Sequence, residues 1–192
     1  MTALQFDEAS HTYSLDGRKL PAVSEVIRPI SPDFTAIPPT VLERKRELGV
    51  AVHYACELYD SNELGDFDDE IRPYLDAWTD FLDQFNAEVV ASEQRLHHPS
   101  LMYAGTLDRV LRVDGQVWLV DIKTSATAYP SYGAQLAGYA LMLESAGTQV
   151  DRRATVHLQA NGKYWMQEFR NPSDQAAFMA CLSIYRWKEA NK

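Results

Sequence analysis

Residues 103–124, YAGTLDRVLRVDGQVWLVDIKT, contain the pattern that decides the fold of this chain. Two apolar runs flank Asp114-Gly115, a dipeptide typical of a two-residue turn between antiparallel strands. If the turn has two residues, the register places Asp108 opposite Asp121 and Leu107 opposite Ile122. The sequence therefore predicts a hairpin, with strands at about 103–113 and 117–124, that carries two facing carboxylates.

Facing carboxylates on paired strands indicate a metal site. Their Cβ atoms would lie about 5 Å apart and the charges would repel unless a cation neutralised them. The apolar run at 117–120 places the second strand in the interior, where little water is present to screen the repulsion between the two carboxylates. Magnesium or manganese accepts such oxygen ligands. Lys123 lies two residues after Asp121, on the same face, and could stabilise phosphate charge. The alternative is an edge hairpin whose acids are solvated.

The rest of the chain reads as helices and strands around this hairpin. Ser24 is the expected cap of a brief helix that runs to Arg28, and Thr40 that of a helix to about Tyr59. Asn161-Gly162 predicts another two-residue turn. The remaining expected elements are a short hairpin at 11–15 and 18–23, irregular chain at 29–39, a helix at 67–86, a strand at 88–97, a helix at 131–146, strands at 153–160 and 163–169, and a helix at 173–189.

This order predicts an α/β (α+β) fold with a central mixed sheet flanked by helices. The 192 residues suffice for one domain, with the hairpin and helices of 1–87 as an N-terminal extension and 88–192 as the core.

Charge and cysteine content exclude several classes of protein. The net charge of -9 argues against diffuse nucleic-acid binding, but residues 57–93 hold twelve acids and one base, Arg72, so a local basic groove remains open. Two cysteines cannot build a disulfide framework or a four-cysteine cluster, which favours a reduced compartment. The uncharged stretch 124–143 contains Pro130, Gln135 and several hydroxyls, so no membrane span is expected.

Four short motifs occur in an order that resembles the PD-(D/E)XK nuclease superfamily, and in particular its RecB-type and phage exonuclease branch. They are Gly49-x-x-x-His53, Gly105-Thr106-Leu107-Asp108, Val120-Asp121-Ile122-Lys123-Thr124-Ser125 and Gln135-x-x-x-Tyr139. Leu107 stands where the superfamily name has proline, and the iron–sulfur cysteines of some relatives are absent. The resemblance implies a restriction-endonuclease-like core.

The resemblance also implies roles for individual residues. Asp108, Asp121, the Ile122 carbonyl and His53 would bind magnesium or manganese, and Lys123 and Gln135 would complete the catalytic set. Tyr139, Thr124 and Ser125 would contact DNA, and Arg44 would bind its phosphates.

Structural interpretations remain for several of these residues. His53 and Tyr139 could be core residues, Gln135 a surface amide and Arg44 a solvated charge. Glu57 and Glu93 stay open: Glu93 could serve a second metal, hold Lys123 or be solvated.

The expected function is that of a metal-dependent DNA nuclease, most of all an exonuclease in phage or bacterial recombination and repair. A structure-specific endonuclease and an inactive nucleic-acid-binding module are the alternatives. DNA is the expected partner, with a recombinase or a single-strand-binding protein as candidates, in the cytoplasm of a bacterial or phage-infected cell.

Overall fold

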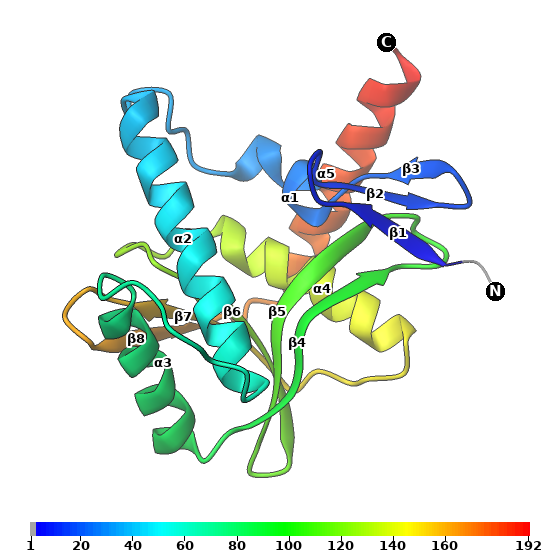
Figure 1. The fold of residues 1–192 in the computed structure, drawn as a ribbon. Coiled ribbons are helices and arrows are strands. Elements are labelled where there is room, and N and C mark those ends of the chain that lie inside the picture. The colour runs from blue at the N-terminus through cyan, green and yellow to red at the C-terminus, as the bar shows by residue number, and fades with distance from the viewer. Residues whose placement is uncertain (1–2) are drawn as a thin grey trace.

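The computed structural model describes residues 3–192 and contains two sheets and several helices (Figure 1). A small sheet comes first and a larger one follows it. The elements are β1 (Leu4–Asp7), β2 (Thr12–Leu15), β3 (Arg18–Leu20), α1 (Val23–Val26), η1 (Arg28–Ile30), α2 (Pro39–Asp60), α3 (Arg72–Phe85), β4 (Glu88–His97), β5 (Ala104–Val113), β6 (Gln116–Lys123), α4 (Ser131–Ser145), β7 (Arg152–Leu158), β8 (Tyr164–Glu168) and α5 (Ser173–Ala190). Within residues 3–192, no helix is both long and apolar enough to cross a bilayer.

The larger sheet has the strand order β4-β5-β6-β7-β8. Adjacent strands of this sheet are antiparallel except β6 and β7, which run parallel and are joined through α4. The predicted central mixed sheet flanked by helices is therefore confirmed.

Two apolar clusters cover the two faces of this sheet. One contains Val110 and Leu119 with the buried residues of α1, α4 and α5. The other contains Leu111 and Val120 with those of α2 and α3. Figure 1 shows α2 and α3 on one side of the sheet and α4 and α5 on the other. The strands are buried on both faces because helices cover both, which explains their continuous apolar runs.

The central hairpin turns where the sequence predicts. Asp114 and Gly115 both have positive φ, 49° and 79°, as a type I′ turn requires. The predicted register holds from Val113–Gln116 to Arg109–Val120. It does not continue, because Leu107 and Ile122 belong to opposite clusters. The expectation that they face each other is wrong: two residues, Asp108 and Arg109, separate Leu107 from Val110 on the same face, so the side-chain alternation of β5 breaks there.

Two predicted helix caps are also wrong. The first helix begins after Ala22, whose N–H donates to Glu25 Oε2 at 3.0 Å, so Ser24 lies inside the helix. The second begins at Pro39, and Thr40 lies inside its first turn. Proline is favoured at a first helical position because its fixed φ suits the helix and its missing N–H would have no partner there.

The last hairpin has a three-residue loop. Leu158 pairs with Tyr164, and Gln159 N–H donates to the Lys163 carbonyl. This leaves residues 160–162 as the loop, so the predicted two-residue turn is wrong. Gly162 has a φ of 76° and is the left-handed residue that commonly ends such a loop.

Candidate active site

Helix α2 brings His53 to the end of β6. The His53 Nε2 atom lies 3.0 Å from the Ile122 carbonyl oxygen. A carbonyl can only accept, so Nε2 carries the hydrogen and donates it. One turn earlier, a Cβ on Gly49 would lie 3.7 Å from Thr124 Oγ1, an ordinary van der Waals contact, so the helix passes beside the end of the strand at this point. The Gly49-x-x-x-His53 motif thus positions the imidazole against β6.

Among the described residues, His53, Glu93 and Asp108 form a group suited to a metal ion, with one ligand atom from each within 4.8 Å of the others. His53 Nδ1 lies 3.6 Å from Asp108 Oδ2 and 3.7 Å from Glu93 Oε1. Because Nε2 carries the hydrogen, Nδ1 presents a lone pair toward the two carboxylates. Imidazole nitrogen with carboxylate oxygens suits manganese, and the two carboxylates suit magnesium. The donor set therefore fits the divalent ion that the sequence predicts.

Glu93, whose role the sequence left open, enters this group through an unusual backbone conformation. Its φ is 47°, a left-handed value that is uncommon for glutamate. The buried Arg109 donates to Glu93 Oε1 at 3.1 Å and so holds the carboxylate in place. Non-glycine residues in such a conformation concentrate at functional sites, where the surroundings compensate the strain.

Asp121 is held beside the group by other residues. Gln135 Nε2 donates to Asp121 Oδ1 at 3.1 Å and also lies 3.3 Å from the Tyr139 hydroxyl. Lys123 Nζ lies 2.5 Å from Asp121 Oδ2. Burial raises the pKa of Asp121 to about 6: it outweighs the nearby Lys123 charge, which lowers the pKa, and the Asp108 charge adds a smaller upward effect. The motif that contains Asp121 and Lys123 and the motif that contains Gln135 and Tyr139 therefore meet at the Asp121 carboxylate.

Asp108 does not stand directly opposite Asp121, as the hairpin register predicted. The β5–β6 pairing ends at Arg109–Val120. Asp108 Oδ2 instead accepts the N–H of Ile122 at 2.8 Å. Asp108 thus turns toward His53, whereas Asp121 turns toward Lys123 and Gln135. The two carboxylates are neighbours with different partners.

Gly105 explains why Tyr139 can lie so close to β5. A Cβ at Gly105 would approach Tyr139 Cε1 to 2.7 Å. Real Cβ atoms do not come that close, so glycine is needed for the ring to pack here and reach Gln135.

The residues predicted to contact DNA have different neighbours in the structure. Thr124 lies against Gly49, and the Ser125 carbonyl accepts a hydrogen bond from the His157 Nδ1. Arg44 instead forms an ion pair with Glu70, and Arg46 lines the cleft above the site.

Two neighbours of the site were not predicted from the sequence. Tyr132 places its ring 4.7 Å from Lys123 Nζ. Arg109 forms a buried ion pair with Asp60 and lies beside the ring of Trp78. An arginine inside the otherwise apolar run of β5 was the available signal for the second feature.

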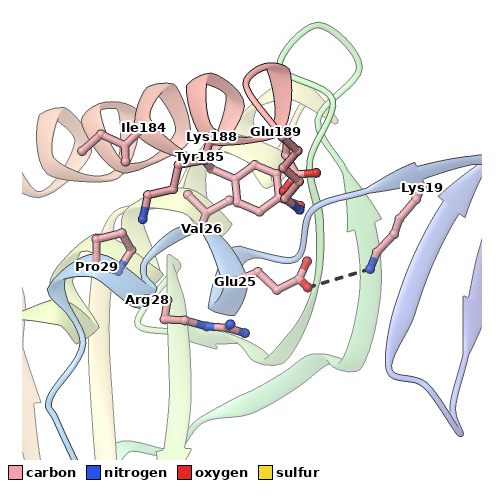
Figure 2. Close-up of a pocket in the computed structure, with 10 residues that line it drawn as sticks. Lys19, Glu25, Val26, Arg28, Pro29, Ile184, Tyr185, Lys188 and Glu189 are labelled. Carbon is pink, nitrogen blue, oxygen red and sulfur yellow. Dashed lines mark hydrogen bonds and ion pairs between the residues drawn. The ribbon is translucent and has the colours of Figure 1, made fainter.

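A cleft of about 540 Å³ opens above the metal-binding group and contains His53, Glu93, Asp108 and Tyr139 in its lining. A second hollow, of about 420 Å³, lies between α5 and the segment of α1 and η1 (Figure 2). Glu25 and Glu189 are its only acids among the described residues, and each is paired with a lysine, so we assign it no catalytic role.

A five-stranded mixed sheet with helices on both faces, and acidic residues where two central strands separate, defines the nuclease-like class of α/β folds. The chain belongs to the PD-(D/E)XK nuclease superfamily, whose sequence model matches residues 66–181, more than half of the chain. The predicted membership is thereby confirmed.

One solved structure of similar fold agrees with this assignment. The chain is similar to an alkaline exonuclease from Laribacter hongkongensis, with a TM-score of 0.50, 13% identity and coverage of 90% of this chain and 89% of that one. A structure of that exonuclease in complex with dAMP matches with a TM-score of 0.45, 14% identity and coverage of 74% and 79%. No curated protein sequence matches the chain.

Proposed function

We propose that this nuclease-family protein is a metal-dependent deoxyribonuclease, and specifically an exonuclease of phage or bacterial recombination and repair. One observation carries the proposal: His53 Nδ1 faces two carboxylates beside the Asp121–Lys123 pair. We take residues 1–192 as one nuclease domain that works in the cytoplasm of a bacterial or phage-infected cell.

Each residue of the site has a proposed task. Asp108, Asp121 and His53 would bind magnesium or manganese, together with Glu93, and the Ile122 carbonyl would join them only after it releases the His53 Nε2 hydrogen. When bound, the ion would offset phosphate charge and make an attacking water more acidic. Lys123 would orient that water and stabilise the charge that develops on the phosphate. Gln135 would hold the Asp121 carboxylate in place, as its hydrogen bond to Oδ1 supports.

Contacts to the substrate are proposed for residues around the cleft. Thr124 and Ser125 would donate hydroxyl hydrogens to phosphate oxygens, and Tyr139 would contact the nucleotide near the scissile bond. Arg44 would reach the substrate only after leaving Glu70. Arg46 lines the cleft, which makes it the better candidate on α2.

Digestion of end-labelled DNA tests this function. Linear and covalently closed circular DNA, single- and double-stranded, would be incubated with magnesium, with manganese and with chelator. We expect metal-dependent release of nucleotides from linear DNA and no cut in circles. Cleavage of circles would identify an endonuclease instead. DNA binding without cleavage in either metal would indicate a binding module.

Asp108→Asn is the matched inactive control for this assay. It keeps the shape of the side chain but removes the charge that faces His53 Nδ1. Activity that survives in this variant would come from a contaminant or from another site.

A further inference from the structure

One wall of the cleft, formed by α2, is unusually apolar for a surface. Val50 and Tyr54 are four residues apart and therefore lie on one helical face, and they are 66% and 60% exposed. Both line the cleft together with His53 and Arg46. An aliphatic and an aromatic side chain so exposed, next to a candidate catalytic residue, indicate a surface that is covered when substrate binds.

The small N-terminal sheet adds aromatic rings to the lining of the cleft. The rings of Phe6 and His11 have centroids 5.0 Å apart, and those of Phe6 and Tyr13 lie 4.7 Å apart. Phe6 and His11 line a wider hollow of about 1180 Å³ that shares Val50, Tyr54 and Glu93 with the cleft, so the two form one groove. The groove is therefore lined by rings from α2 and from the N-terminal sheet.

Charge along the groove disfavours a ligand that presents only phosphates. The acids Glu8, Glu43 and Glu47 line the outer part of the groove. Its two arginines, Arg46 and Arg95, are each already paired with one of these acids, Glu43 and Glu8. A duplex turns its phosphates outward and hides its bases, so such walls would repel it. An unpaired strand can turn its bases to the walls instead.

We propose that this groove binds unpaired DNA, with bases stacked on Tyr54 and against Val50, and delivers one phosphate to the acidic group at its floor. The inference rests on the proposed nuclease function and names its substrate class: single-stranded DNA, or the unpaired end of a duplex. Stacking on aromatic side chains is tolerant of sequence, which suits a nuclease that processes ends of any composition.

Binding measured in chelator tests the groove without cleavage. The probe is a 15-nucleotide strand with 2-aminopurine near one end, used alone and annealed to its complement. We expect the wild type to bind the single strand more tightly than the blunt duplex. The fluorescence of the modified base should fall on binding as it stacks.

Variants of the wall assign the effect to its side chains. Tyr54→Ala should lose about ten-fold in single-strand affinity, the loss typical of one stacked base, whereas Tyr54→Phe, which keeps the ring, should retain it. Val50→Ser should weaken binding in the same direction. The matched control is Trp187→Ala on α5, an aromatic residue that is 67% exposed and lines neither part of the groove. It should bind as the wild type does.

Salt dependence separates stacking from phosphate contacts. Among the described residues, Arg46 and Arg95 are the arginines that line the groove, so log affinity should fall against log salt with a slope no steeper than about -1.4, the value for two phosphates of a single strand.

Unchanged affinity in Tyr54→Ala, or duplex bound as tightly as single strand, would overturn the inference. Hydrolysis of bis(p-nitrophenyl) phosphate with manganese tests the metal site alone. Hydrolysis without single-strand binding would retain the nuclease and reject the groove. Single-strand binding without any hydrolysis would retain the groove as a binding site and reject the nuclease function.

Discussion

At the scale of single residues, the two central aspartates differ in their partners more than in their chemistry. Asp108 faces His53 and accepts one backbone N–H, and its charge raises the pKa of Asp121. Asp121 instead neutralises Lys123, whose side chain is only 21% exposed. Removal of either should abolish metal-dependent cleavage, but the effects on the metal-free fold should differ.

We therefore expect Asp108→Asn to keep or raise the melting temperature in chelator at alkaline pH, where His53 is neutral and the substitution relieves repulsion between the two carboxylates. Asp121→Asn should lower the melting temperature, because Lys123 then stays charged in a largely buried place without its partner. Calorimetry in chelator measures both, and a manganese titration should show weakened binding in each. A lower melting temperature in Asp108→Asn than in Asp121→Asn would contradict this assignment of partners.

His53 should make metal affinity and metal-free stability respond to pH in opposite ways. Burial opposes its charge, but Asp108 and Glu93 outweigh burial and raise the pKa of His53 above its usual 6.5. A raised pKa means that the protonated histidine stabilises the metal-free fold. That stability is fully present below pH 6.5 and is lost as pH rises through the higher pKa of the folded state.

Metal binding needs the unprotonated imidazole, so manganese affinity should fall as pH drops through the same range. Melting in chelator and manganese titrations at pH 5.5, 6.5, 7.5 and 8.5 would measure the two trends. His53→Ala should flatten both, while Asp121, with its pKa near 6, leaves a smaller residual slope. A wild-type melting temperature in chelator that rises from pH 6.5 to 8.5 would show that protonated His53 does not stabilise the metal-free fold.

At the scale of elements, α4 depends on its glycines to pack against α5. A Cβ at Gly138 would lie 2.6 Å from Phe178 Cε2, and Phe178 is fully buried. The Gly138 carbonyl also accepts the Tyr103 hydroxyl hydrogen at 2.7 Å, which limits how far the helix can move. The contact between the two helices is therefore set by the absence of a side chain.

Gly138→Ala should cost about 1–3 kcal/mol of unfolding free energy through overpacking, although alanine favours helices more than glycine does. In a chain of this size each kcal/mol lowers the melting temperature by about 2–4 °C. The control is Gly65→Ala, where a Cβ meets nothing within 4 Å and φ is not positive. Equal melting temperatures for the two variants would show that α4 and α5 can separate freely.

At the scale of the whole molecule, Arg109 links elements that are far apart in the sequence. Its guanidinium, on β5, pairs with Asp60 at the end of α2 and with Glu93 on β4. Asp60 Oδ1 also accepts the Trp78 Nε1 hydrogen from α3 at 2.8 Å. The helix that carries His53 is thus tied to the strands that carry the carboxylates.

Arg109→Met should cost about 3–5 kcal/mol, because Asp60 is left charged and buried without its partner. Arg109→Met combined with Asp60→Leu should recover part of that loss. The coupling is the change in unfolding free energy of the double variant minus the sum of the changes in the two single variants. Urea unfolding with an unchanged slope gives these values. Strict additivity of the two substitutions would contradict the link.

How far the sequence could predict the fold follows from the range of each interaction. Hairpin β5–β6, helix α4 and strand β4 could be placed from sequence because turn dipeptides and hydrophobic periodicity act over a few residues. The caps of α1 and α2 could not, since competition between proline, alanine and hydroxyl residues at a helix start depends on the entering chain. The break in alternation at Asp108 and Arg109 has no local signal beyond an arginine among apolar neighbours.

Sequence alone was enough to predict the superfamily, the central hairpin and the motif residues that would act on phosphate. Which of these residues meet depends on tertiary packing. Packing brings His53 to Glu93 and Asp108 across α2, β4 and β5, and places Asp121 with Lys123 and Gln135. The reason is physical: strand periodicity fixes directions only while the ladder is regular. Where the pairing of β5 with β6 ends and Glu93 adopts a positive φ, packing and the buried Arg109 set where the carboxylates point.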